Sequence, residues 1–347
     1  MLEPTGDSYG RELMTKYVLK RLAFLPPQII GVTLITFLLV RLLPGNPAVL
    51  LLGPDATPLG VARMDQRLGL SHPLYVQYAL YLNNLIHGNL GTSFYTGQPV
   101  TSEIGQRLPA TLELITYSLI VMVVLGLLGG AFVAWRPKGI VDRVAFVYGM
   151  LAGALPDFWL GLLLLYFFFF KLGWLPPPVG RIASNIPPPP HVTGFYTIDS
   201  VLSRDWPALA SSVEHLILPV TTLVLAYMGS ILKMTRASLS EVLQSDMIEF
   251  ARASGLSRID ILRYGLRNAF PPIVTVIGLS YGFLLGGAVL VETIFSWGGL
   301  GQYAVQAVLN SDYAALQGFL LVAAIFNLFV YLAVDIVNRI VDPRRQI

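Results

Sequence analysis

Acidic residues that interrupt long apolar runs are the side chains of this sequence most able to contact a polar group inside a membrane. Asp157 directly follows Pro156 and is the only charged residue between Val144 and Phe170. An ionised carboxylate at the centre of a bilayer costs roughly 2.5 to 3.5 kcal/mol unless it is paired or wetted. Asp157 is therefore a candidate contact for an amine or polar group of a solute crossing the membrane. The alternatives are a structural partner for backbone groups freed by Pro156, or a position near the membrane surface.

The other titratable residues indicate neither a metal site nor a catalytic centre. Glu292, Asp312 and Asp335 lie at the ends of apolar runs, where water reaches them, so we expect interfacial positions rather than a proton relay. The chain contains no cysteine, and its histidines are His72, His87, His191 and His215. Their spacing places no two of them on one helical face. These observations argue against a zinc site, a Ser-His-Asp triad and a thiolate nucleophile.

The composition requires a lipid environment for most of the chain. Hydrophobic residues make up 54% of the 347 residues and charged residues 12%, about half the charged fraction of a soluble domain. The apolar runs are long enough, at roughly 1.5 Å per residue, to cross a hydrocarbon core of ~30 Å. The sequence thus predicts an all-α, polytopic membrane protein with six transmembrane helices, at about residues 22–42, 112–135, 144–170, 215–233, 270–292 and 313–337.

The basic residues predict the orientation of these helices. With six spans, 16 of the 23 Lys and Arg residues fall on the side of the two termini and seven on the other. The positive-inside rule then places both termini in the cytoplasm. This bias accounts for the net charge of +3 without nucleic acid as a partner. The predicted cytoplasmic ends are residues 1–21 and 341–347, and the transmembrane domain covers residues 22–340. Within that domain, the outer loops are expected at 43–111, 171–214 and 293–312. Met14 is an alternative start of translation.

The outer loops differ in their expected structure. Turn residues and an aromatic-rich segment in the first loop favour short helices at the membrane surface. In the second loop, the proline runs at 176–178 and 187–190 lack amide donors and predict a stiff, extended chain.

The cytoplasmic segment 234–269, between the fourth and fifth spans, has an amphipathic pattern of its own. Gly255 is a natural helix stop, and Ser257 followed by Asp260 indicates a capped start, so we expect a helix, a tight turn and a second helix. A short helix with small residues at its turn fits the cleft of a soluble partner. The alternative is a charged hairpin of the kind that any transporter or channel carries. The expected apolar face comprises Ile248, Ala251, Gly255, Ile259, Leu262 and Leu266.

The residues of this hairpin resemble a known motif. Glu249, Phe250 and Ala251, followed after three residues by Gly255, are similar to the Glu-Ala-Ala-x-x-x-Gly motif of ABC importer permeases. The hairpin looks most like the dipeptide, oligopeptide and nickel branch of that family. Further matches are Arg41–Pro47, Gly88–Phe94, Arg107–Leu114, Pro156–Gly161 and Glu292–Gly301, so the resemblance covers nearly the whole chain from Met14.

Three positions depart from the pattern of this branch. Phe250 replaces a small residue of the motif, and Gly298 stands where the branch usually has proline. Asp157 occupies a position where a small or polar residue is more familiar, so substrate contacts there cannot be transferred from relatives.

The resemblance implies a permease subunit of an ATP-driven, binding-protein-dependent importer, with small peptides or similar solutes as cargo, in the bacterial inner membrane. Glu249, Ala251, Arg252 and Gly255 would form its ATPase-coupling element. The implied partners are two ATP-binding subunits, a second homologous permease, a periplasmic or extracellular substrate-binding protein and the lipid bilayer. The chain has no Gly-x-x-x-x-Gly-Lys phosphate loop, so ATP and magnesium would be bound by partner subunits, and this chain is expected to bind no cofactor and catalyse no reaction.

Two other classes of membrane protein fit the sequence less well. A gradient-driven secondary transporter of small polar solutes is expected to have paired charges deep in several helices, whereas Asp157 is one isolated acid. A membrane-bound enzyme needs a cluster of reactive side chains near one membrane face. The substrate stays open among dipeptides, oligopeptides, nickel chelates, glutathione, sugars and opines, and so does the identity of the partner permease.

Overall fold

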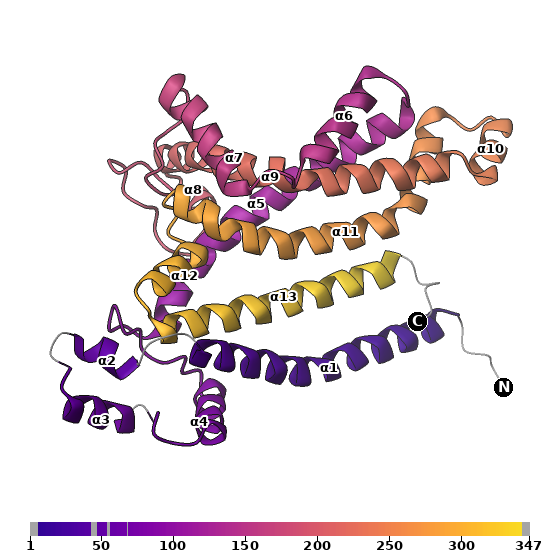
Figure 1. Ribbon diagram of the computed structural model, residues 1–347. Coiled ribbons are helices and arrows are strands. Elements are labelled where there is room, and N and C mark those ends of the chain that lie inside the picture. The colour runs from indigo at the N-terminus through magenta and orange to yellow at the C-terminus, as the bar shows by residue number, and fades with distance from the viewer. Residues whose placement is uncertain (1–5, 43–46, 54–55, 68, 342–347) are drawn as a thin grey trace, which may run out of the picture. The chain divides into compact units, whose positions relative to one another are not determined.

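The protein is built from helices. The computed structural model describes residues 6–42, 47–53, 56–67 and 69–341, and the only strand-like pairing in these ranges is an isolated bridge between Thr92 and Pro99. The chain forms two compact units, one of residues 1–110 with 298–328 and one of residues 111–297 with 329–347 (Figure 1).

Five helices are long and apolar enough to cross a membrane, counting only the described residues. Their length and composition confirm the prediction of an all-α, polytopic membrane protein. These helices are α1 (Gly6–Leu42), α5 (Val100–Trp135), α9 (Trp206–Leu243), α11 (Arg258–Ile294) and α13 (Tyr313–Val341).

The sixth expected span, 144–170, is not one continuous helix, and that part of the prediction is wrong. The chain forms α6 (Ile140–Leu151), a break at residues 152–156, α7 (Asp157–Leu164) and the π-helix η2 (Leu165–Lys171). Gly153 at φ +83° and Pro156 interrupt the helix, because a proline disfavours helical geometry in the residue before it. Whether these pieces together cross the bilayer, as a sixth span, stays a prediction.

The expected outer loops contain helices of their own. In the first loop lie α2 (Pro47–Leu52), α3 (Pro58–Arg67) and α4 (Leu74–Ile86), which confirms the expectation of short helices there. The proline runs of the second loop are not helical, but α8 (Tyr196–Ser203) follows them, and α12 (Leu300–Leu309) lies in the third. Helices α5 and α9 also begin well before their predicted first residues, at Val100 and Trp206.

In the unit of residues 1–110 and 298–328, Asp312 joins a loop to a helix start. Its carboxylate accepts from the Ser93 hydroxyl at 2.5 Å and from the Ala315 amide at 3.1 Å, in the first turn of α13. Val100 and Ile104 of α5 pack nearby against Tyr303 of α12 in a buried apolar cluster. Asp312 is itself buried, so the expectation that water reaches it is wrong.

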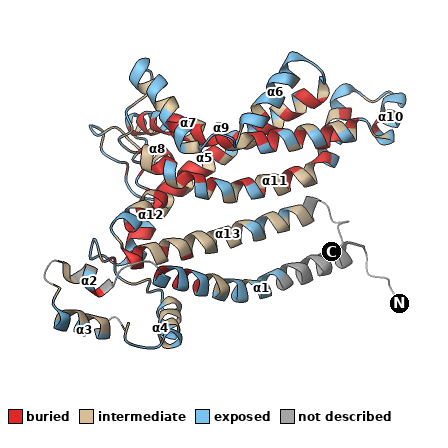
Figure 2. Ribbon diagram, in the orientation of Figure 1, coloured by how far each residue is buried: buried red, intermediate tan, exposed pale blue. Residues whose placement is uncertain are grey.

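In the unit of residues 111–297 and 329–347, α9 and α11 pack along each other and form the centre (Figures 1 and 2). Helices α6, α7 and α8 pack on α9, and α7 also packs on α11. The second outer loop is fixed to α5 by a buried ion pair between Arg181 and Glu113, whose carboxylate also accepts from the Thr197 amide at 2.9 Å. The loop residues beside α9 are therefore held in a defined conformation.

Glycines allow α5 to approach α9 closely. A Cβ atom on Gly130 would lie 2.6 Å from the Thr235 Cβ and 2.8 Å from the Leu232 carbonyl oxygen. At Gly126, four residues earlier, it would lie 2.8 Å from an Ile231 methyl carbon. This small-xxx-small spacing is the arrangement that lets backbones of membrane helices come close enough for dispersion contacts.

Replacing Gly130 with alanine is expected to force α5 and α9 apart. We expect a loss of about 1–3 kcal/mol in the free energy of unfolding, because the new methyl group overlaps backbone as well as side-chain atoms. Gly129→Ala is the matched control, since its Cβ would meet only a Leu232 methyl at 3.4 Å. Thermal unfolding in detergent measures both variants, and equal stability of the two would contradict this account of the packing.

Candidate functional site

The candidate coupling segment forms a short helix between two long ones, as predicted. Helix α9 ends at Leu243, α10 (Asp246–Ala253) follows, and α11 begins at Arg258. The connection is shorter than the expected hairpin 234–269, because both long helices continue into that range. Figure 1 shows α10 at one end of the α9–α11 pair.

Gly255 ends α10 through a complete Schellman turn. Its φ is +80°, its amide donates to the Arg252 carbonyl at 3.0 Å, and the Leu256 amide donates to the Ala251 carbonyl at 3.1 Å. Nothing else in the described chain would lie within 4 Å of a Cβ atom at Gly255. The structure therefore requires glycine here for its backbone angle and not for close packing within the chain.

The next helix begins with a reciprocal cap. The Ser257 hydroxyl accepts from the Asp260 amide at 3.2 Å, and this hydroxyl lies 2.6 Å from the Asp260 carboxylate. The predicted helix stop and helix start are thus both confirmed. Together they fix the angle between α10 and α11.

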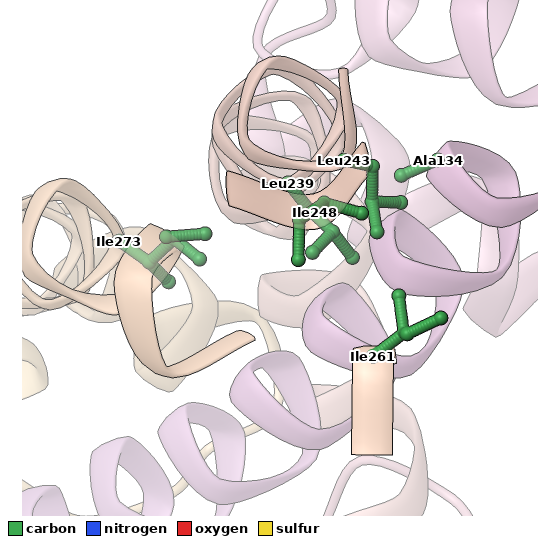
Figure 3. Packing of buried hydrophobic residues seen from close by; sticks show 7 residues of the cluster. Ala134, Leu239, Leu243, Ile248, Ile261 and Ile273 are labelled. Carbon is green, nitrogen blue, oxygen red and sulfur yellow. The ribbon is translucent and has the colours of Figure 1, made fainter. Parts of the chain in front are cut away.

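One side chain anchors α10 to the rest of its unit. Ile248 is fully buried, among Leu239 and Leu243 at the end of α9 and Ile261 of α11. Figure 3 shows Leu239, Leu243 and Ile248 close together, with Ala134 of α5 beside Leu243. No other residue of α10 is buried.

The expected apolar face is correct for Ile248 and wrong for Ile259 and Gly255. Ile259 is 79% exposed; the buried face of α11 runs through Ile261, Gly265 and Ala269, and the predicted Leu262 and Leu266 are partly buried against the same cluster. The turn between α10 and α11 changes which residues face inward, so a single helical repeat cannot predict the buried residues on both sides of the turn.

The predicted coupling residues lie together on α10 and its turn. Glu249, Arg252 and Gly255 are exposed, and Ala251 is half-buried. The acidic residues of α10 lie in its first turn and Arg252 in its last, the order that the helix dipole favours. Figure 2 shows this end of the unit largely exposed.

Phe250 is a further candidate that the sequence pattern marked only as a departure from the motif. Its side chain is 75% exposed, next to Glu249 and Ala251. Beside α10, a recess of about 570 Å³ is lined by Arg252, Arg258 and Trp135, among others. Phe250 does not line this recess, but a large exposed aromatic side chain on a helix that also borders a basic recess is suited to contact with a protein partner.

Asp157 begins α7 and joins three helices. Its carboxylate accepts from the Phe158 amide at 2.8 Å and from the Tyr227 hydroxyl of α9 at 2.9 Å. Gly287 of α11 lies against the same group, since a Cβ there would be 2.5 Å from an Asp157 oxygen. These contacts support the structural interpretation of Asp157, and its contact with a solute stays a prediction.

The other acidic residues do not form a site with Asp157. Glu292 is fully buried and accepts from the Thr111 hydroxyl of α5 at 2.6 Å, so the expectation that water reaches it is wrong. Within the described part of the chain, no group of three or more His, Asp or Glu residues is placed to hold a metal ion.

Comparison with known proteins covers both halves of the chain. A family model described as "Binding-protein-dependent transport system inner membrane component" matches residues 123–347, and its N-terminal counterpart matches residues 14–115. A dipeptide transport system permease protein of Alkalihalophilus pseudofirmus is 40% identical, over 95% of this chain and 99% of its own. A di/tripeptide transport system permease protein of Pseudomonas aeruginosa is 39% identical, over 95% and 98%. A glutathione transport system permease protein of Salmonella choleraesuis is 37% identical, over 95% and 98%.

Gly255→Ala is expected to loosen the end of α10. The left-handed backbone costs an L-residue about 1–2 kcal/mol, whereas asparagine visits it more readily, so Gly255→Asn should cost less. Hydrogen exchange of the Leu256 amide measures the turn directly. We expect exchange about tenfold faster in the alanine variant, with asparagine in between; equal exchange in the wild type and the alanine variant would refute the turn's dependence on φ.

Asp157→Ala is expected to destabilise the α7–α9 contact by about 2–3 kcal/mol, since the Tyr227 hydroxyl and the Phe158 amide lose their acceptor. Asp157→Asn retains an acceptor oxygen and should cost about 1 kcal/mol, mostly through the lost charge at a helix start. Thermal unfolding, measured together with solute uptake, separates the two interpretations. Uptake abolished in a fully stable Asp157→Asn variant would favour solute contact over the structural role.

Proposed function

Because the chain belongs to the family of binding-protein-dependent transport system inner membrane components, we propose that it lines one side of a path for small peptides, which partner ATPases open by acting on α10. It is a permease subunit of an importer in the inner membrane, a transport component that works with ATPase and substrate-binding components.

The proposed assembly contains two ATP-binding subunits, a second homologous permease and one external substrate-binding protein. ATP and magnesium belong to the ATP-binding subunits, and this chain supplies the membrane path. Both termini and α10 face the cytoplasm, an orientation supported by the 16 basic residues on that side of the six-span topology.

The proposal rests on how α10 is attached to the rest of its unit. Its one buried residue, Ile248, lies between the end of α9 and the start of α11, while Glu249, Phe250 and Arg252 point into solvent. A partner that displaces α10 therefore pulls on two membrane-length helices through one packed contact. Because α7 also packs on both of those helices, such a movement reaches the broken segment at Asp157.

Short peptides are the proposed cargo. The relatives are named for dipeptides, di- and tripeptides and glutathione, all of them small molecules with a free amino group and free carboxylates. The sequence left several solute classes open, and these names favour the peptide class among them.

Phe250→Asp is expected to release the ATPase subunits without unfolding the permease. A charge in place of an exposed aromatic side chain removes an apolar anchor, and we expect at least about tenfold weaker association in a pull-down from detergent. Trp206→Asp is the matched control, because Trp206 is an aromatic residue, 60% exposed, at the first position of α9 and therefore at the end of that helix remote from α10.

Each outcome of this pull-down has a separate meaning. Loss of the ATPases with Phe250→Asp and retention with Trp206→Asp support the proposed docking helix. Wild-type permease that retains no ATPase subunit would contradict the proposed assembly, and a Phe250→Asp variant that binds like wild type would contradict the docking face alone.

A further inference from the structure

A recess of about 540 Å³ lies at the end of α9 that is remote from α10. Its walls are the proline-rich loop around Pro176, Pro177 and Asn185 and the first turns of α9, from Pro207 to His215. The volume is in the range of small-molecule sites. The Ala183 amide donates to the Ser211 hydroxyl at 3.0 Å, which fixes the loop against the helix.

His215 lines this recess and has one polar side-chain atom without a partner. The side chain is only 6% exposed, and its Nδ1 lies 2.7 Å from the Ser211 carbonyl oxygen. A carbonyl oxygen only accepts, so Nδ1 carries the hydrogen, and in the neutral ring Nε2 is an acceptor. Nε2 is buried and has no hydrogen-bond partner among the described residues. A buried acceptor without a donor is unfavourable unless a ligand or water supplies one.

The lining also holds one carboxylate. Glu214 is exposed at the recess and forms no ion pair within the described chain, so its carboxylate is available. Pro176, Pro177 and Pro207 have no amide hydrogen to donate, and the Pro177 carbonyl already accepts from the Val179 amide at 2.9 Å. The recess thus combines one negative charge with a buried ring nitrogen that lacks a donor, beside the hydroxyl and amide groups of Ser184, Asn185 and Ser211.

We propose that this recess binds the ammonium group of a small peptide, with Glu214 and His215 Nε2 as its acceptors. An ammonium has three donors and a positive charge, which complement the Glu214 carboxylate and the unpartnered His215 nitrogen. The inference rests on the proposed peptide cargo. The proposed contact for the peptide's amino terminus lies at the start of α9. In the proposed orientation this end of the helix faces the outside, from which the peptide is delivered.

A divalent cation is the less suitable occupant. A zinc site takes three or four side-chain ligands, whereas the recess offers one histidine and one carboxylate. A lysine side chain of another protein has the same ammonium chemistry as a peptide's amino terminus, so the experiment must separate these two sources.

The test uses the full chain in lipid nanodiscs with ¹⁵N-labelled histidine, whose four side chains give few signals. The probes are Ala-Ala, N-acetyl-Ala-Ala, Nα-acetyl-lysine and Zn²⁺. We expect Ala-Ala to shift the Nε2 signal of His215, and acetylation of its amino group to weaken binding at least about tenfold, the loss of a charge-assisted hydrogen bond. Glu214→Gln should weaken Ala-Ala binding to a similar degree.

Two variants keep the test independent of folding. Glu214 is exposed, so its replacement leaves the buried packing intact, and His191→Gln in the same loop changes an exposed histidine that does not line the recess. His191→Gln should bind Ala-Ala like wild type. His215→Gln identifies the signal.

Several results would overturn the inference: equal binding of the acetylated peptide, no shift with any amine, a shift with Zn²⁺ alone, or a preference for Nα-acetyl-lysine over Ala-Ala. A permease that retains its ATPase subunits but shows any of these results loses only the proposed recess. Failure to bind ATPases would instead count against the proposed importer assembly.

Discussion

The burial of Ile248 is the interaction on which the proposed coupling depends. Eight residues of α10 have too few hydrogen bonds to form a stable helix alone, so tertiary packing must hold them. Ile248 supplies that packing between the end of α9 and the start of α11, and the two caps at Gly255 and Ser257 fix the direction. Because α10 is fixed to α9 and α11 and its outer face is exposed, a partner that binds this face can move α10 as a rigid unit and shift both of those helices with it.

The membrane imposes the second constraint, because polar backbone groups in lipid must find partners within the protein. Long unbroken helices meet this requirement by themselves. In the proposed sixth span, the break before α7 leaves backbone amides that need other partners, and the Asp157 carboxylate accepts from one of them and from the Tyr227 hydroxyl of the neighbouring helix. The same residue thus allows a broken segment and joins it to α9, which α10 is proposed to move.

Features that depend on local chemistry were predictable from sequence. Charge-free runs marked five membrane helices, and Gly255 with Ser257 and Asp260 marked the turn after α10. The break in the sixth run was missed because strong apolarity outweighed the signals of Gly153 and Pro156. The buried positions of Glu292 and Asp312 depend on contacts with residues about 180 and 220 positions away in the chain, and no local pattern contains those contacts. Likewise, Ile259 is exposed because the turn at Gly255 starts a new helix with a different orientation of its buried face. A single helical period applied to the whole hairpin cannot reveal that change.

The chain contains no cysteine, so a single introduced cysteine gives the most direct test of the central claim that α10 receives the ATPase. Met247 is 48% exposed on α10, and Met247→Cys can be cross-linked in native membranes that contain all the partner subunits. The account predicts a cross-link to an ATPase subunit whose yield changes when ATP is added and hydrolysed. A cysteine at this position that reacts freely with soluble reagents but never cross-links to an ATPase would contradict it.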